Sequence, residues 1–238
     1  MKRLFPVLLL ILFGEFVIAG PGSGHHKDST YDYDYDDYER GGHHKAPAYD
    51  YHDYVNSNIQ SKTFARHQND GVVYDEVWSF DRPDPGEVVR TEIATDADGS
   101  IFRCRVNRFE VTAEVFKWAQ QHSCDGSTPP VLINTTDYIP PLSVFTNAMV
   151  PGIAWGAAGE IHTTYTLDNY YTDVSEVLAV EDVTVPAGTY NDCLKIYRQR
   201  AFMSYIPRIE WVCPNMGLVK SVNGSNRLME LTDVTFNN

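Results

Sequence analysis

Apolar and polar residues alternate at period two over most of the chain from about Val72 onward, which is typical of half-buried β-strands. Turn residues rich in Gly, Pro and Asp separate the runs, and no stretch keeps a helical period of 3.6 over a useful length. Regularly spaced short strands of this kind favour an antiparallel barrel or a strongly curved sheet. We therefore predict an all-β fold, a strongly curved antiparallel sheet or half-barrel. The predicted strands span residues 72–80, 87–95, 100–109, 111–118, 160–167, 174–185, 189–200, 208–213, 217–222 and 228–235.

Residues 125–160 interrupt this pattern with closely spaced Pro and Gly, including Pro140-Pro141 and Pro151-Gly152. Such composition is typical of loops, so we predict a long loop that could fill the concave side of the sheet. Asp96-Ala97-Asp98-Gly99 resembles the start of a calcium loop. It lacks the later ligands and the bidentate Glu of that motif, which favours a hairpin turn instead.

The first 19 residues have the order of parts found in secretory signal peptides. Lys2 and Arg3 form a short cationic start, residues 4–13 are almost entirely apolar, and Ala19 offers a small residue for cleavage. The apolar run is short for a membrane-spanning helix, although an uncleaved anchor is the alternative. We predict a secreted or periplasmic protein with no transmembrane segment after cleavage, organised as a signal peptide (1–19), an arm (20–58) and a single β-rich domain (59–238).

The arm at 20–58 has an unusual composition, with alternating Tyr and Asp at 31–38 and almost no aliphatic residues. It cannot bury enough apolar surface to offset its ordering entropy, so we predict that it is disordered. Imidazole beside carboxylate suits Cu(II), Ni(II) or Zn(II), so the arm is either a weak transition-metal site or a solvated spacer. The candidate metal ligands are His25, His26, His43, His44 and His52.

The net charge restricts the classes of partner, and the cysteine content restricts the kinds of disulfide or metal site. A net charge of −13 argues against nucleic acid and against electrostatic attraction to anionic lipid. Four cysteines in an exported chain indicate two disulfides, with free buried thiols as the alternative, and their spacing is not that of a zinc site. No cofactor is implied apart from a metal on the arm.

A set of motifs in the C-terminal half carries a family resemblance. Val-Pro-Ala-Gly-Thr-Tyr at 185–190, Cys-Leu-Lys at 193–195, and Trp-Val-Cys-Pro-Asn-Met-Gly-Leu-Val-Lys at 211–220 occur in order. The set resembles a group of bacterial cell-envelope proteins that share V-P-A-G-T-[FY], C-L-K and W-x-x-P-x-x-G-L-V-K. The resemblance implies a curved antiparallel sheet similar to the half-barrels of periplasmic lipoprotein carriers, and it transfers no catalytic residues.

Elementary physics explains the same motifs as turns and strand contacts. Two residue pairs in these motifs suit turns between strands: Pro186 with Gly188, and Pro214 with Gly217. Trp211 begins the second motif. If strands 189–200 and 208–213 pair antiparallel about residue 203, Cys193 faces Cys213. We therefore predict Cys193–Cys213 and Cys104–Cys124 disulfides.

Known catalytic motifs are absent from the chain, and His162 beside Glu160 is the nearest approach to a general base. Because a lone strand histidine is usually structural, we predict that the protein is not an enzyme. The predicted function is that of an exported cell-envelope or extracellular β-domain, binding or structural, with an unknown partner. A carrier of an apolar ligand in the concave sheet is the alternative, and an unrecognised hydrolase is a lesser one.

Overall fold

The structure is a computed structural model, and it describes residues 58–125, 127, 131–164, 169–201, 207–224 and 227–237. The described residues form twelve strands and no helix. The predicted signal peptide and the His25 to His52 candidates lie outside them. The strands are β1 (Ile59–His67), β2 (Val73–Asp81), β3 (Glu87–Thr95), β4 (Ile101–Val111), β5 (Val115–Cys124), β6 (Leu132–Thr146), β7 (Ala154–Thr163), β8 (Asn169–Val185), β9 (Gly188–Ala201), β10 (Arg208–Cys213), β11 (Gly217–Asn223) and β12 (Leu228–Phe236).

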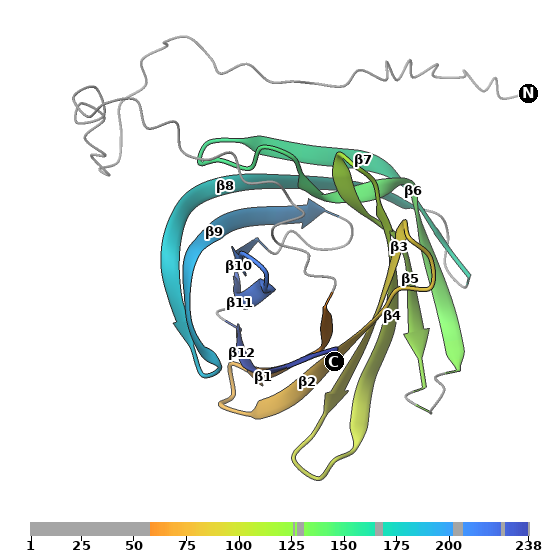
Figure 1. Ribbon diagram of the computed structural model, residues 1–238. Helices are drawn as coiled ribbons and strands as arrows, with labels where there is room; N and C mark the ends of the chain where they lie inside the picture. The colour runs from red at the N-terminus through yellow and green to blue at the C-terminus, as the bar shows by residue number, and fades with distance from the viewer. Residues whose placement is uncertain are drawn as a thin grey trace, which may run out of the picture. The chain divides into compact units, whose positions relative to one another are not determined.

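All twelve strands pair antiparallel with their sequence neighbours, and β1 pairs with β12 to close a barrel (Figure 1). The prediction of an all-β, strongly curved antiparallel sheet is confirmed, and the half-barrel is a partial match, because β1 and β12 pair and close the sheet into a full barrel. Closure depends on β1, which the sequence did not predict as a strand. Its inward positions include Lys62 and Arg66, so the polar and apolar residues of β1 do not separate cleanly by face.

The prediction of a long loop at 125–160 is also wrong, since β6 and β7 occupy most of it and belong to the barrel wall. The prolines fit because residues 138–141 of β6 lie opposite one β5 position, Ala119, in an irregular part of the ladder where Pro is tolerated. In β7, a Cβ at Gly159 would collide with the Ile139 carbonyl oxygen. Glycine therefore allows close approach between β6 and β7 rather than marking a loop.

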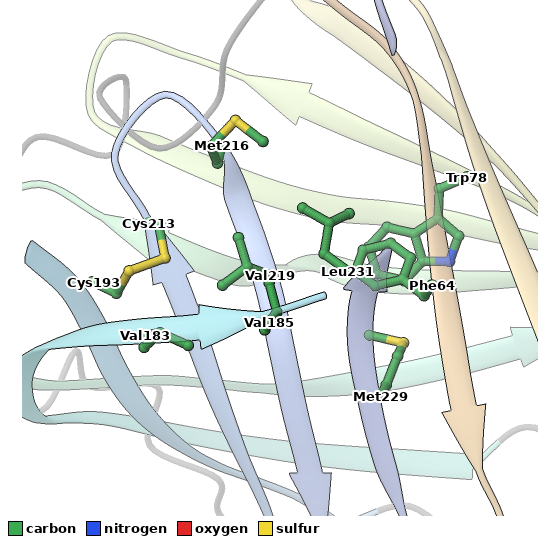
Figure 2. Close-up of a cluster of buried hydrophobic side chains, with 10 residues drawn as sticks. All are labelled: Phe64, Trp78, Val183, Val185, Cys193, Cys213, Met216, Val219, Met229 and Leu231. Atoms are coloured by element: carbon green, nitrogen blue, oxygen red, sulfur yellow. A yellow bond between two sulfur atoms is a disulfide. The ribbon is translucent and has the colours of Figure 1, made fainter. Parts of the chain in front are cut away.

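Side chains alternate between the barrel interior and solvent along each wall strand. On β2, Tyr74, Glu76 and Trp78 are buried while the residues between them are exposed. One apolar interior cluster packs around Phe64 and Trp78, whose ring centroids are 4.6 Å apart, and the Cys193–Cys213 bridge lies at its border (Figure 2). Its buried members are Phe64, Trp78, Val183, Val185, Cys193, Cys213, Met216, Val219, Met229 and Leu231.

A second apolar cluster, which includes Phe109, Met149 and Ile196, lines the interior of β3 to β6 and β8 to β10. Met149 lies in the segment between β6 and β7 and is fully buried. That segment therefore contributes Met149 to the core. Most of the stretch predicted as a loop, residues 125–160, lies instead in β6 and β7 of the barrel wall.

The interior is apolar toward one end of the barrel and polar toward the other. On β9, Leu194 and Ile196 lie next to the β8–β9 turn, and Arg198 and Arg200 follow farther from it. On β4, Phe109 lies near the β4–β5 turn, and Arg103 and Arg105 are farther from it. Consecutive antiparallel strands place the β4–β5 and β8–β9 turns at the same end of the barrel. The arginines of both walls therefore gather toward the opposite end.

Candidate functional site

The barrel contains a cavity of about 280 Å³ whose lining is dominated by arginine. Of the ten arginines among the described residues, nine line this cavity, and Arg108 is the exception. Lys62 is the one described lysine in the lining. The nine arginines are Arg66, Arg82, Arg90, Arg103, Arg105, Arg198, Arg200, Arg208 and Arg227.

Four buried carboxylates accompany these arginines, two on each side of the barrel: Glu76 on β2, Glu92 on β3, Asp173 on β8 and Glu210 on β10. Glu76 is fully buried and is shared by Arg66 and Arg103, while the Trp78 indole donates to it at 2.7 Å. One carboxylate thus faces two guanidinium groups, and the cationic charge is only partly compensated.

The opposite wall repeats this arrangement around Asp173 and Glu210. Asp173 lies 3.1 Å from Arg200 Nε and 3.8 Å from Arg198 Nη1. Glu210 lies 3.2 Å from Arg198 Nε and 3.0 Å from Arg208 Nη1. Three arginines therefore share two carboxylates on this wall.

Arg90 connects the ionic part of the cavity with the aromatic part. Its guanidinium carbon lies 4.1 Å from the Trp78 ring centroid and 4.9 Å from that of Phe109, and Nη2 lies 2.5 Å from Glu92. Asn107 donates to Glu92 at 2.9 Å, which leaves the buried Asn107 Oδ1 without a hydrogen-bond partner. Stacking on aromatic faces holds Arg90 in place beside the cavity.

For Glu92 and Glu210, the surrounding arginines lower the pKa of the carboxyl group. Burial raises the pKa of Glu92, but Arg90, Arg105 and further arginines outweigh it and hold the pKa below its usual range. Glu210 follows the same pattern, with burial opposed mainly by Arg198 and Arg208. Nine arginines thus line a cavity that has two carboxylates in its lining, Glu92 and Glu210, with Glu76 and Asp173 buried beside it and Asp81 acting on Arg82, so arginines outnumber these carboxylates.

Arg105 is the arginine best placed to receive a ligand. It projects from β4 into the cavity, and within the described parts of the chain no carboxylate lies within ion-pair distance of its guanidinium. Its charge still acts on Glu92, its cross-strand neighbour, and helps to lower the pKa of that carboxyl group. A ligand carboxylate or phosphate could accept two parallel hydrogen bonds from such a group.

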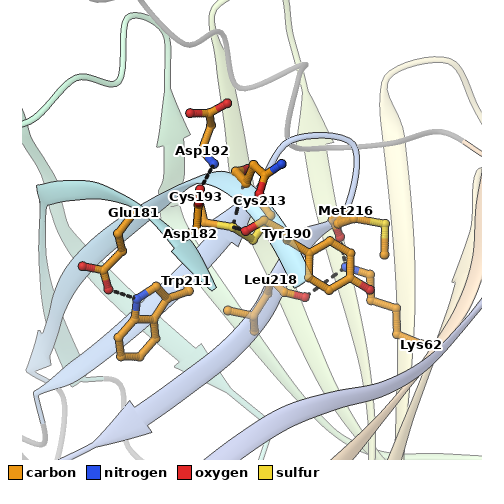
Figure 3. Close-up of a disulfide and its surroundings, with 11 residues drawn as sticks. Lys62, Glu181, Asp182, Tyr190, Asp192, Cys193, Trp211, Cys213, Met216 and Leu218 are labelled. Carbon is orange, nitrogen blue, oxygen red and sulfur yellow. Dashed lines mark hydrogen bonds between the residues drawn. A yellow bond between two sulfur atoms is a disulfide. The ribbon is translucent and has the colours of Figure 1, made fainter. Parts of the chain in front are cut away.

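Lys62 lies fully buried on the apolar side of the cavity. Its Nζ donates to the main-chain oxygens of Met216 and Leu218, the latter at 3.1 Å (Figure 3). Burial, reinforced by the charge of Arg90, lowers the pKa of Lys62 from 10.5 to about 7. The amine is therefore substantially neutral near physiological pH.

The sequence prediction missed the arginine-lined cavity, although two signals for it were present. Arg103 and Arg105, and likewise Arg198 and Arg200, lie two residues apart in predicted strands and so share a face. Period two alone does not say whether that face is inside or outside.

The sequence-derived structural residues lie where hairpin geometry predicts. The structure contains both predicted disulfides, Cys104–Cys124 and Cys193–Cys213, and Arg198 pairs with Arg208, which is symmetric about residue 203. The turns of the motif lie at Pro186 and Pro214, with Gly188 and Gly217 opening the strands that follow. Trp211 Nε1 donates to Glu181 at 2.6 Å.

Neither metal-ligand clusters nor a buried catalytic pair emerges from the described residues. Among them, no group of three or more His, Cys, Asp or Glu side chains could hold a metal ion. His162 Nε2 lies 3.1 Å from Glu160, but both side chains are about half exposed and neither lines the cavity. No helix in the described part of the chain is long and apolar enough to cross a membrane.

Comparison with known proteins gives a fold likeness. No protein-family model and no curated protein matches the chain. A "putative exported protein with YmcC-like fold" from Bacteroides fragilis has a TM-score of 0.53 and 16% identity, covering 76% of this chain and 98% of that chain. A "putative lipoprotein" from Parabacteroides distasonis has a TM-score of 0.51 and 16% identity, covering 76% of this chain and 97% of that chain. At this identity the likeness concerns the fold alone.

Proposed function

We propose that this chain is an exported, non-enzymatic binding protein whose barrel takes a small anionic ligand into its arginine-lined cavity. The observation that carries the proposal is the concentration of nine arginines around one cavity in a chain with a net charge of −13. Of these nine, Arg198 is buried, Arg208 and Arg227 are exposed, and the other six are partly buried. Partly desolvated cations are costly unless anions accompany them, and four buried carboxylates lie among these arginines. A bound anion supplies the missing counter-charge.

The cavity also defines the ligand's shape and polarity. Its volume of about 280 Å³ is at the lower end of the range for small-molecule sites, which suits a compact ligand. Arginine is suited to carboxylate, phosphate or sulfate groups, since its planar fork matches their oxygens. Phe109, Phe116 and Phe145 line the other part of the cavity, so the ligand combines an anionic group with a short apolar part.

Export rests on several independent supports. The N-terminal residues have the order of a signal peptide, and the motif set resembles cell-envelope proteins. Two disulfides are typical of an oxidising compartment. The two structural neighbours are themselves described as exported or as a lipoprotein. We place the protein in the periplasm or outside the cell on these grounds.

The alternative of a carrier for a purely apolar ligand is less well supported. Such a carrier needs a continuous apolar concavity, whereas the lining here mixes aromatic and aliphatic side chains with the nine arginines. A structural component with a plugged interior is disfavoured as well, because β6 and β7 lie in the wall.

The test compares three probes with the full mature chain: octyl phosphate, octyltrimethylammonium and inorganic phosphate. Trp78 and Trp118 line the cavity, so binding should change their fluorescence. We expect octyl phosphate to bind, the cation not to bind, and inorganic phosphate to bind more weakly than octyl phosphate, because it lacks the apolar part.

Two matched variants separate the cavity from general surface charge. Arg105→Gln removes a cation that has no carboxylate partner, so it should weaken octyl phosphate binding about tenfold, as expected for one charge-assisted hydrogen bond. Arg108→Gln removes the one described arginine outside the cavity and should leave binding unchanged. Equal affinity for the octyl cation and anion, or equal effects of the two variants, would contradict the proposal.

A further inference from the structure

Lys62 is the one described lysine that lines the cavity, and its surroundings differ from those of a lysine that forms a salt bridge. It projects from β1, where its cross-strand neighbours are Trp78 on β2 and Val234 on β12. Within the described residues no carboxylate lies within ion-pair distance of Nζ, whose hydrogen-bond acceptors are the carbonyl oxygens of Met216 and Leu218. The nearby charge that acts on it is the cation Arg90.

This set of partners fits the neutral amine better than the ammonium ion. A neutral amine has two N–H bonds, which match the two carbonyl acceptors, and it keeps one lone pair. An ammonium ion has three donors, and within the described residues only the two carbonyl oxygens accept from Nζ, so the third donor would face a cavity rich in arginine. Hydrogen-bond geometry, burial and the repulsion from Arg90 therefore all favour the nucleophilic form.

We propose that Lys62 captures an anionic aldehyde or ketone in the cavity as a reversible imine. This inference rests on the proposed function, because the arginines supply the affinity that brings the anionic group to the site. Lys62 gives that ligand a second, covalent point of attachment.

The reaction balances without any group beyond the ligand. The Nζ lone pair attacks the carbonyl carbon and forms a carbinolamine. The carbonyl oxygen then leaves as one water molecule with the two amine protons, and a C=N bond replaces the C=O bond. Addition of water reverses the step, so the ligand is released unchanged.

Arg90 is placed to position such a ligand. Its guanidinium stacks on Trp78, which is itself the cross-strand neighbour of Lys62. A ligand whose anionic group binds Arg90 would therefore place its carbonyl group, a few atoms along the same molecule, close to Lys62 Nζ. The expected ligand is compact, with its carbonyl and its anionic group separated by only a few bonds.

The experiment uses pyridoxal 5′-phosphate as an anionic aldehyde probe on the full mature chain, followed by borohydride reduction and peptide mapping by mass spectrometry. We expect the reduced adduct predominantly on Lys62. At pH 7 an amine with a pKa near 7 is half neutral, whereas an ordinary lysine is neutral roughly a thousandfold less often. Lys117, Lys195 and Lys220, which lie outside the cavity, are internal controls in the same digest.

Two further arms make the result decisive. Pyridoxal, which lacks the phosphate, should label Lys62 much less, and the Lys62→Met variant should lose the adduct. Labelling spread evenly over the surface lysines would overturn the imine. Octyl phosphate binding without an adduct on Lys62 would overturn the imine and leave the proposed function standing. If the native chain neither bound octyl phosphate nor formed the adduct, the imine and the proposed function would both be overturned.

Discussion

Glu76 offers the sharpest test of how the cavity balances its charge. The substitution Glu76→Gln removes a fully buried negative charge that Arg66 and Arg103 share, while the new amide oxygen can still accept the Trp78 indole hydrogen bond. Removing one partner of a buried ion pair costs about 3–5 kcal/mol. Because the shape and one hydrogen bond are kept, we expect about 3 kcal/mol.

The expected loss is measurable and leaves the protein folded. For a domain of this size, each kcal/mol lowers the Tm by about 2–4 °C, so Glu76→Gln should lower it by roughly 6–12 °C. Domains of this kind have a free energy of unfolding of about 5–15 kcal/mol, so most of the chain stays native at 25 °C. Glu87→Gln is the matched control, because it removes an exposed pair with Arg108 whose worth is below about 1 kcal/mol.

The same substitution should strengthen anion binding. A unit charge removed at about 10 Å from the ligand, at an effective dielectric of about 20, changes the binding free energy by about 1.7 kcal/mol, or roughly tenfold in Kd. Octyl phosphate titrated into Glu76→Gln, Glu87→Gln and the native chain measures this effect. A less stable variant that bound the anion no more tightly would refute the idea that excess cavity charge drives binding. A Tm change below about 2 °C would refute the energetic importance of the pair.

Three other outcomes follow from the structure. Replacing Cys193 and Cys213 together by Ala opens a loop with a sequence separation of 20, so calorimetry should show a loss of about 3 kcal/mol, and an unchanged Tm would contradict it. Gly159→Ala places a methyl group against the Ile139 carbonyl oxygen and should lower the Tm by several degrees, whereas Gly99→Ala at an open turn meets no atom and pays only backbone strain. The lowered pKa of Lys62 means that the unfolded chain binds more protons between about pH 7 and 10.5, so stability should rise with pH across that window, and Lys62→Met should flatten the profile in urea titrations.

The sequence predicts local pairing well because local pairing depends on nearby residues. The β9–β10 register follows from turn chemistry and the position of two cysteines, and the observed Leu194–Val212 partners keep the symmetry about residue 203. The strand at 59–67 pairs with the adjacent β2 on one side, but its partners on the other side, in β12, lie about 170 residues away, and nothing in its local pattern identifies them. Closure of the barrel is consequently a non-local property.

The Pro- and Gly-rich stretch shows a second limit. Pro140 and Gly159 are ordinarily signals for loops, yet here they accommodate one irregular region and one close approach between adjacent strands. Whether a glycine marks a loop or a tight interstrand contact depends on what lies opposite it. That information is absent from the residue's own neighbourhood in the sequence.

The positions of the arginines show that net charge does not predict the charge inside the barrel. Asp and Glu outnumber Lys and Arg by 32 to 19 over the whole chain, which argues against large polyanions such as nucleic acid. Nine arginines nevertheless line the cavity, seven of them buried or partly buried, so cationic side chains gather there although the net charge of the chain is negative. On the proposed function, the acidic charge of the whole chain disfavours extended polyanions and anionic membranes, while a small anion that enters the barrel meets the arginines at the polar end of the cavity. The proposal therefore predicts opposite preferences for large and for small anions.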